Sequence, residues 1–282
     1  MRINTNVSSL NAQESAINTN SNITSSLEKL SSGLKINKAS DDASGLAIAD
    51  KLRTQATSIN QGVDNGNSAV ALLQIADKSM AEQSNILDTI KAKLIQANTS
   101  TTSSDGRAAI ADDVSKLLDQ LDNIAAQTNY NGTYLLQENA TSSAASTALS
   151  FQIGEKSTDT ISTAAITSNV TGLGLTSIRT SVDAGGISVS LAGTAQTTVD
   201  TAITTLNSNR SEIGSTQNQV ESAVRNLMTQ ATNVKAAESI IRDVDYAQES
   251  ANFNKQNIIS QAGSYAISQA NATQQNVLRL LQ

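Results

Sequence analysis

The chain has 282 residues and a formal net charge of −6 at pH 7, and it contains no Cys, His, Pro or Trp. Without His and Cys, nucleophilic triads and dyads and the usual zinc sites are excluded. The negative charge gives no basis for nucleic-acid binding, and no apolar run is long enough to span a bilayer. We therefore expect no enzyme: no catalytic residue, no cofactor, no metal site, no nucleic-acid partner and no membrane insertion.

The first predicted element is an amphipathic helix over residues 1–34. Its apolar residues recur at helical spacing and begin with Ile3, Val7, Leu10 and Ile17. The opening stretch MRINTNVSSLNAQES has no apolar region of the kind that a cleaved secretory signal requires. Two interpretations stay open at this point: a cytosolic helical protein, and export by a route that needs no cleaved signal.

A polar stretch over residues 30–50, LSSGLKINKASDDASGLAIAD, follows this helix. It places two neighbouring carboxylates, Asp41 and Asp42, between Gly33 and Gly45. A hard cation needs about six oxygen ligands, which the local sequence does not supply, so a cation site is the weaker interpretation. The stretch is better interpreted as a joint between two helices, where the glycines permit a turn.

Two further helices are predicted to form an antiparallel hairpin. The polar turn NTSTTSSDG separates them, and Ser104-Asp105 has the chemistry of a helix start. Their apolar residues follow alternating steps of three and four, which is the spacing of a heptad seam. The first seam contains Leu73, Ala76, Met80, Gln83, Leu87, Ile90, Leu94 and Ala97, and the second contains Ile110, Val114, Leu117, Leu121, Ile124 and Thr128.

The middle of the chain, residues 130–198, is predicted to be a small β-rich insert. Asn131-Gly132 is a hairpin turn signal between Tyr130 and Tyr134. The stretches STALSFQIG and GGISVSLAG are typical of short strands, and turns that contain glycine surround them.

The longest predicted helix follows the insert, and a terminal helix ends the chain. The long seam cannot be buried against itself, so it needs the two hairpin helices, which predicts a three-helix bundle. Apolar stripes at both ends of a chain either pair with each other or stay exposed until a partner covers them. The long seam contains Val199, Ile203, Leu206, Arg210, Ile213, Gln217, Val220, Val224, Leu227, Ala231, Val234, Glu238 and Ile241, and the terminal stripe contains Ile259, Ala262, Ala266, Ala270, Thr273, Val277 and Leu280, next to Leu281.

The predicted fold class is therefore mainly α: a long-helix coiled coil or three-helix bundle with a small β-hairpin insert and paired terminal helices. A signalling coiled coil of similar composition would need a membrane anchor, and the β insert does not fit such a protein. Asp112-Asp113 lies on a predicted helix, where adjacent side chains point in different directions. That pair is interpreted as a solvated face rather than a catalytic acid pair.

Several motifs, in family order, resemble those of bacterial flagellins. The stretch LSSGLKINKASDDASGLAIADKLRTQ resembles the N-terminal signature of that family, and MRINTNVSSLNAQ resembles its opening. The last stretch, SQAGSYAISQANATQQNVLRLLQ, resembles the family's close. Further segments that resemble the family are RSEIGSTQNQVESAVRNL, RDVDYAQES, NYNGTYLL and FQIG.

This resemblance implies a structural subunit that self-assembles into the helical filament of the bacterial flagellum, the propeller for swimming. It implies an extracellular protein that is exported without a cleaved signal peptide. Its implied partners are further copies of itself, an export chaperone, the flagellar secretion apparatus, the filament cap and the hook-junction proteins. The alternative within the same group is the hook–filament junction protein, which shares the terminal design.

In flagellins, paired terminal helices form the inner layer of the filament and a helical bundle forms the next layer. The resemblance implies that residues 1–40 and 243–282 lie in the inner layer and residues 41–242 in the bundle, without outer variable domains. Gly33, Asp41, Asp42 and Gly45 are then expected at the joint between the layers. The residues expected to pack between subunits are Ile3, Val7, Leu10, Ile17, Ile259, Ala266, Val277, Leu280 and Leu281.

One departure from the family concerns host recognition. Flagellins that Toll-like receptor 5 detects resemble LQR(I/V)RELA(V/T)Q on the first bundle helix, and the aligned stretch here is LDTIKAKLIQ, residues 87–96. The apolar seam is kept, whereas Thr89, Ala92 and Lys93 replace the receptor-facing Arg, Glu and Leu. The replacements remove a bidentate cation and an apolar contact, so we expect weak or absent recognition by this receptor.

Overall fold

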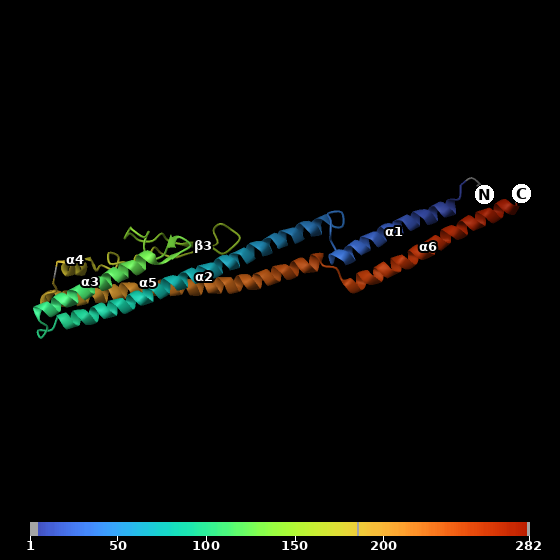
Figure 1. Ribbon diagram of the computed structural model, residues 1–282. Coiled ribbons are helices and arrows are strands. Elements are labelled where there is room, and N and C mark those ends of the chain that lie inside the picture. Colours follow the sequence, from blue (N-terminus) through green and yellow to red (C-terminus); the bar gives the residue numbers. More distant parts are fainter. Residues whose placement is uncertain (1–4, 185, 281–282) are drawn as a thin grey trace. The chain divides into compact units, whose positions relative to one another are not determined.

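The computed structural model describes residues 5–184 and 186–280, and most of its regular structure is helical (Figure 1). The described helices are α1 (Val7–Ser32), α2 (Ala43–Ala97), α3 (Ser104–Gln127), α4 (Thr176–Asp183), α5 (Val189–Arg242) and α6 (Tyr246–Leu280). Two antiparallel hairpins pair β1 (Asn129–Tyr130) with β2 (Thr133–Tyr134) and β3 (Ser150–Gln152) with β4 (Thr160–Ser162). The predicted fold class, mainly α with a small β-hairpin insert, is confirmed.

The described residues group into two compact units. The terminal unit contains the residues up to Ala56 together with those from Thr232 onward, and the central unit is Thr57–Ala231. Helices α2 and α5 contribute residues to both units. The layer boundaries at residues 40 and 243, which the family resemblance implies, stay a prediction.

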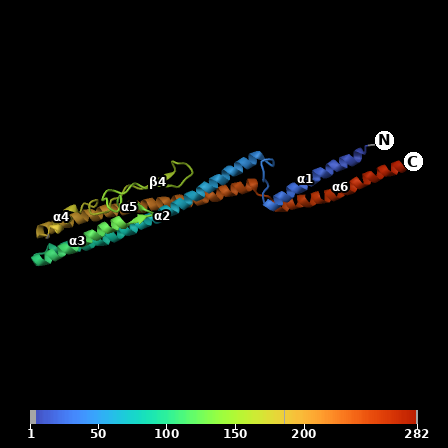
Figure 2. The same cartoon turned by 45° about the horizontal axis from the view of Figure 1, so that its top comes forward.

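The apolar core lies in the central unit, where α2, α3 and α5 pack together (Figure 2). The first predicted seam is buried at each of its positions from Leu73 to Ala97. On α5 the predicted seam is buried at Val199, Leu206, Ile213, Val220, Val224 and Leu227. At two places it is shifted by one residue, because Ala202 and Thr216 are buried while Ile203 and Gln217 are partly exposed. The predicted seam runs through larger residues and so omits these small side chains. Small side chains are nevertheless suited to a buried seam, because they allow two helices to approach closely.

Local chemistry explains several element boundaries. The Ser103 side chain accepts a hydrogen bond from the Gly106 N–H at 3.1 Å, so α3 is capped one residue before the predicted start. Asn131 and Gly132 have φ values of 49° and 81°, which suits the tight turn between β1 and β2. The predicted Asn-Gly turn is confirmed, because Tyr130 lies opposite Thr133 in the hairpin.

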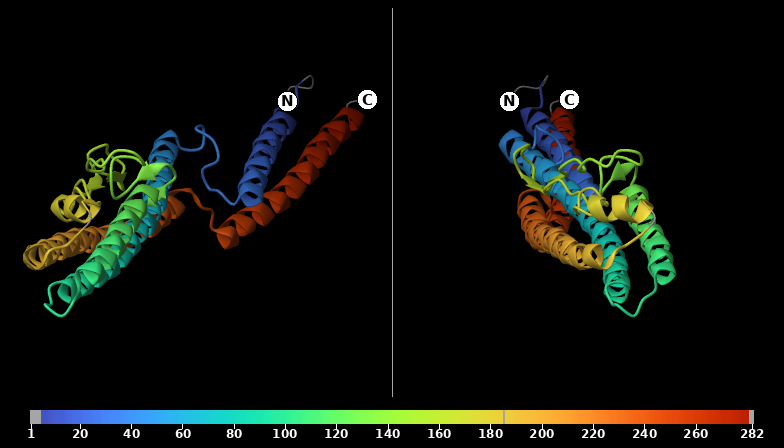
Figure 3. Two further views of the ribbon diagram at one scale, coloured as in Figure 1. Left: turned by 60° about the vertical axis from the view of Figure 1, so that its left-hand side comes forward. Right: turned by 90° about the vertical axis from the view of Figure 1, so that its left-hand side faces the viewer.

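Much of the predicted β-rich insert, residues 130–198, is not β structure. The predicted strand at GGISVSLAG is wrong, because α5 begins at Val189. Alternating Ile187, Val189 and Leu191 imitate a strand, whereas Ala192 and Ala195 continue the helical seam of α5 and are buried. Helix α4 was not predicted; it packs on α3 and buries Ile178 and Val182 (Figure 3). In both cases burial against neighbouring helices overrides a short local pattern.

Candidate functional site

Helices α1 and α6 lie side by side and antiparallel in the terminal unit (Figures 1 and 2). The residues of each helix that face the other helix recur in steps of three and four, but most of them are small or polar. These partly or fully buried positions include Asn6, Ser9, Ala12, Ala16, Thr19, Ile23, Ser26 and Leu30 at α1, and Glu249, Phe253, Gln256, Ser260, Gly263, Ile267, Ala270 and Gln274 on α6.

Hydrogen bonds between polar groups connect the two helices along this seam. The Asn6 side-chain amide donates to the carbonyl oxygen of Ala270 at 3.2 Å, and the Ser260 hydroxyl donates to the Asn20 side chain at 3.3 Å. Near the other end of the pair, the Ser26 hydroxyl donates to the Glu249 carboxylate. Partly exposed hydrogen bonds contribute about 0.5–1.5 kcal/mol each, so this seam is a weak source of stability.

Several large apolar residues of the pair point outward instead, although Ile23, Leu30, Phe253 and Ile267 lie on the seam. On α1 the side chains of Val7, Leu10 and Ile17 are 56%, 54% and 62% exposed. On α6, Ile259 is 42% exposed and Ala266 is also exposed. An ordinary surface helix has the reverse arrangement, with its apolar stripe on the buried side. The outer faces of α1 and α6 therefore form an apolar surface suited to burial against further helices.

The remaining residues predicted to pack between subunits fall at the chain ends. Ile3 and Leu281 lie outside the described residues. For Val277 and Leu280 the structure describes the backbone of α6 but not the side chains.

The stretch predicted as a joint connects α1 to α2. Asp41 Oδ2 accepts hydrogen bonds from the backbone N–H groups of Asn37 and Lys38, both at 3.1 Å. These two hydrogen bonds lower the pKa of the Asp41 carboxyl group. Asp42 Oδ1 accepts from the N–H groups of Ser44 and Gly45, both at 3.0 Å, and so satisfies free donors in the first turn of α2.

The two glycines of this stretch allow close contacts. Gly33 has a φ of 73° and ends α1, and a Cβ atom there would lie 2.9 Å from the Tyr246 hydroxyl oxygen. A Cβ atom at Gly45 would lie 2.7 Å from Cδ1 of Ile36, whose side chain is buried. Ile36 therefore fills the space that the missing side chain of Gly45 leaves. The described residues contain no group of three or more acidic side chains that could hold a metal ion.

Arg242, the last residue of α5, contacts the same stretch and is not among the predicted site residues. Its Nε–H donates to the carbonyl oxygen of Ile36 at 3.3 Å, and its guanidinium nitrogen lies 3.7 Å from Asp50 Oδ1. The Arg242 side chain is 16% exposed. The family-like segment RDVDYAQES begins at Arg242, but it does not indicate this contact, because Ile36 lies 206 positions away in the chain.

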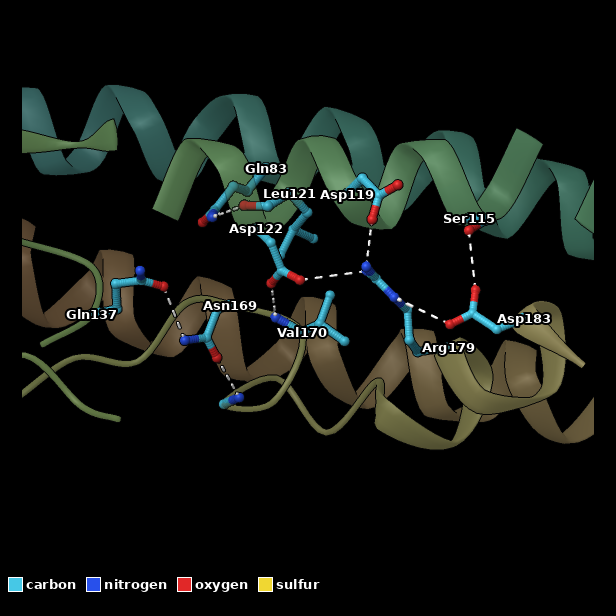
Figure 4. Close-up of polar contacts among 11 residues, drawn as sticks. Gln83, Ser115, Asp119, Leu121, Asp122, Gln137, Asn169, Val170, Arg179 and Asp183 are labelled. Atoms are coloured by element: carbon cyan, nitrogen blue, oxygen red, sulfur yellow. Dashed lines mark hydrogen bonds and ion pairs between the residues drawn. The ribbon is translucent and has the colours of Figure 1, made fainter. Parts of the chain in front are cut away.

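A buried amide cluster attaches the irregular segment 163–175 to α2 and α3, and Figure 4 shows its contacts from Gln83 to Leu121 and from Asn169 to Gln137. The Gln83 side-chain amide donates to the carbonyl oxygens of Leu121, at 3.2 Å, and Ser168, at 2.7 Å. Its oxygen accepts the Ser168 hydroxyl. Next to it, the Asn169 amide donates to the Gln137 side chain at 3.2 Å. Among the described residues, no buried side-chain N or O atom lacks a hydrogen-bond partner, as expected of a structural cluster.

Arg179 attaches α4 to α3 in the same region (Figure 4). Its guanidinium group pairs with Asp119, with Asp122 at 3.4 Å and with Asp183 at 3.6 Å. Asp122 also accepts the Val170 N–H at 2.8 Å, so one carboxylate links α3 to both α4 and the irregular segment.

The three residues predicted to alter receptor recognition lie on α2. Thr89 and Ala92 are exposed, and the Thr89 hydroxyl donates to the carbonyl oxygen of Asn85 at 2.9 Å. The Lys93 ammonium group is 2.8 Å from Asp113 Oδ2 on α3. This contact lowers the pKa of the Asp113 carboxyl group.

No described helix has the length and apolar character that a membrane span requires.

Comparisons with known proteins point to one family. The profile described as "Bacterial flagellin N-terminal helical region" matches residues 3–141, and the one described as "Bacterial flagellin C-terminal helical region" matches residues 196–281. The chain is 36% identical to a flagellin of Bacillus subtilis over the full length of both proteins. It is 45% identical to flagellin B of Helicobacter pylori over 160 residues, a match that covers 57% of this chain and 30% of that relative.

Two solved structures have similar folds. The crystal structure of Bacillus cereus flagellin aligns with a TM-score of 0.50 and 28% identity, and the match covers 62% of this chain and 94% of that one. A putative flagellar hook-associated protein from Vibrio parahaemolyticus aligns with a TM-score of 0.61 over 72% of this chain and 99% of that one. At 12% identity, the second likeness shows the fold alone.

Proposed function

The chain belongs to the bacterial flagellin family, and from that premise we propose that it is the structural subunit of the extracellular flagellar filament. Many copies of the chain assemble into a helical propeller for swimming. The observation that carries this proposal is the apolar surface on the outer faces of α1 and α6. That surface has no use in an isolated soluble chain, because exposed apolar patches favour aggregation.

The mechanism follows from the two faces of the helix pair. Complete burial of a large aliphatic side chain contributes about 1.5–3 kcal/mol, and ordering a residue costs about 1–2 kcal/mol of backbone entropy. The polar seam between α1 and α6 does not offset that cost for two helices of 26 and 35 residues. Neighbouring copies complete the burial, so the terminal helices become fully ordered when the filament forms.

The residues at the chain ends extend this proposal. Residues 1–40 and 243–282 form the inner layer of the filament, and residues 41–242 form the surrounding bundle. Ile3, Val277, Leu280 and Leu281 add to the contacts between subunits. Gly33, Asp41, Asp42 and Gly45 shape the joint between the layers. This is supported by the backbone hydrogen bonds that the Asp41 and Asp42 carboxylates accept and by the close approach of Ile36 to Gly45.

The proposed partners follow from the same exposed surface. Before assembly the apolar faces of α1 and α6 need cover, which supports an export chaperone and delivery through the flagellar secretion apparatus without a cleaved signal peptide. At the ends of the filament the partners are the cap and the hook-junction proteins. Recognition by Toll-like receptor 5 is weak or absent, since Lys93 points its charge at Asp113 and Thr89 and Ala92 offer neither a cation nor a carboxylate.

Assembly by the purified full-length chain tests the proposed function. We expect seeded polymerisation to give filaments that sediment and are visible by negative-stain electron microscopy. The double variant Leu10→Gln, Ile17→Gln removes two large side chains from the outer apolar face of α1 without touching the seam, so it should remain soluble. The matched control Asn11→Gln lies between these positions, is also exposed and should polymerise. Filaments formed equally by the double variant would contradict the proposal.

A further inference from the structure

We propose that Arg242 is a latch that couples two connectors, residues 33–42 between α1 and α2 and residues 243–245 between α5 and α6. With the latch closed, neither connector rearranges without the other. All the contacts that define it lie within the terminal unit.

The backbones of the two connectors pair over a very short distance. The Lys35 N–H donates to the carbonyl oxygen of Arg242 at 2.6 Å, and the Val244 N–H donates to that of Gly33 at 3.0 Å. Leu34 and Asp243 form the single antiparallel bridge between them. Two hydrogen bonds at a partly exposed bridge stabilise a pairing only marginally. The bridge alone would open often.

The Arg242 side chain adds a second connection, directed further along the first connector. Its Nε–H reaches the carbonyl oxygen of Ile36, while another guanidinium nitrogen lies near Asp50 on α2. The planar guanidinium group presents several donors in a fixed fork, so one side chain serves both acceptors. Asp50 is itself held by Arg53 at 2.9 Å, which keeps its carboxylate beside the latch.

The acceptor on the first connector is a buried anchor. The Ile36 side chain is 4% exposed and packs against Gly45, so its backbone has little freedom of its own. Arg242 belongs to the backbone that continues into the second connector, and its own carbonyl oxygen accepts the Lys35 N–H. One residue therefore ties the second connector both to the bridge and to the anchor of the first.

The consequence of this coupling rests on the proposed filament function, because it requires neighbouring copies that hold α1 and α6. Once neighbouring copies hold α1 and α6, any reorientation of these helices relative to α2 and α5 must change the backbone of both connectors. A latch that makes them change together restricts a chain in the filament to concerted rearrangements, rather than independent adjustment of each connector.

Amide hydrogen exchange of the full-length chain tests the latch. The variant Arg242→Met keeps most of the side-chain volume but removes every donor. The matched control Arg225→Met removes the same group from the same helix, where the side chain is 69% exposed. Filaments are collected by sedimentation and exchange is then measured. If the wild-type chain does not sediment, the proposed filament function fails, and exchange is measured in the soluble chain instead.

We expect Arg242→Met to accelerate exchange at the Lys35 and Val244 amides together, by about tenfold or more, as loss of a hydrogen bond from a charged donor predicts. Exchange in α3 should stay at the wild-type rate, which shows that the central unit is folded. Arg225→Met should leave both amides unchanged. Acceleration at only one of the two amides, or at neither, would overturn the coupling.

Discussion

A Cβ atom at Gly62 on α2 would lie 1.9 Å from the carbonyl oxygen of Ile153, so the backbone after β3 rests directly on this glycine. The Asn65 side chain, one turn further along α2, donates to the carbonyl oxygen of Gln152 at 3.0 Å. Replacing a helical glycine by alanine ordinarily stabilises a helix by about 0.5–1 kcal/mol. At Gly62 the contact is with backbone, which no side-chain rotation relieves.

We therefore expect Gly62→Ala to lower the free energy of unfolding by about 1–3 kcal/mol, in the range of an overpacked contact, and to release the β3–β4 hairpin. Chemical denaturation measures the first effect, and amide exchange at Phe151 measures the second. Gly214→Ala on α5 is the control, because a Cβ atom there meets no atom within 4 Å. It should raise stability, and a stabilising Gly62→Ala would show that the hairpin does not depend on this contact.

The Asp41 carboxylate gives the connector a dependence on acid. Hydrogen bonds from the N–H groups of Asn37 and Lys38 lower its pKa below the ordinary value of 3.8. Its contribution to stability is therefore complete above the pKa of the unfolded chain and is lost as the pH falls through the lower, folded pKa. The contribution of Lys38 depends on pH in the reverse direction. Its hydrogen bond to Glu28 raises its pKa, so the contribution of the lysine is complete below the pKa of the unfolded chain and is lost as the pH rises through the higher, folded pKa.

A titration by NMR follows this directly. We expect the amide proton shifts of Asn37 and Lys38 to change together as the pH falls, with a midpoint below 3.8. In the variant Asp41→Asn the same amides should show no such step. A wild-type midpoint at or above the ordinary value would mean that these hydrogen bonds are absent in solution.

At the scale of elements, the amide cluster around Gln83 connects α2 and α3 to a segment with no regular structure of its own. Gln83 sits on an otherwise apolar seam, and both it and Ser168 are fully buried. An apolar side chain of similar size would fill the space but leave the Ser168 hydroxyl and carbonyl groups without their partner. Unpaired buried polar groups cost about 1–3 kcal/mol each.

Gln83→Met is accordingly expected to lower the free energy of unfolding by about 1–3 kcal/mol. In the double variant Gln83→Met, Ser168→Ala the unpaired hydroxyl is gone, so the cost should be smaller than the sum of the two single costs. Denaturant unfolding of the four chains completes the cycle. Additive costs would mean that the two side chains act independently.

The outward surface of α2 carries the predicted loss of receptor recognition. Restoring the family residues with Thr89→Arg, Ala92→Glu and Lys93→Leu should raise the response of reporter cells that express Toll-like receptor 5. The variant loses two surface contacts, the Lys93 ion pair with Asp113 and the hydrogen bond from the Thr89 hydroxyl to Asn85, so folding should persist. Thr201→Arg is the control, since Thr201 is also exposed and its hydroxyl also bonds within its own helix. A potent response to the wild-type chain would refute the expectation.

Over the whole molecule, the apolar core and the outward apolar surface belong to different parts of the chain. The large core cluster lies in the central unit and extends to the start of α5, whereas α1 buries only Thr19 and Ser26. Helix content should therefore rise when the chain polymerises, and far-ultraviolet circular dichroism before and after seeding measures it. The non-assembling Leu10→Gln, Ile17→Gln variant should show no change. A free chain that already has its full helix content would contradict coupled folding and assembly.

Sequence alone was sufficient for the α2 seam from Leu73 to Ala97, the Asn131-Gly132 turn and the family, because these patterns are local or recur as motifs. It also indicated apolar stripes at Val7, Leu10 and Ile17, but periodicity does not say which partner covers a stripe. The tertiary structure revealed that a polar seam pairs α1 with α6 and leaves those stripes outside. The contact between Arg242 and Ile36 depends on two segments that are distant in the chain. The same is true of the burial of Ala192 in the first turn of α5, and no local pattern encodes either approach.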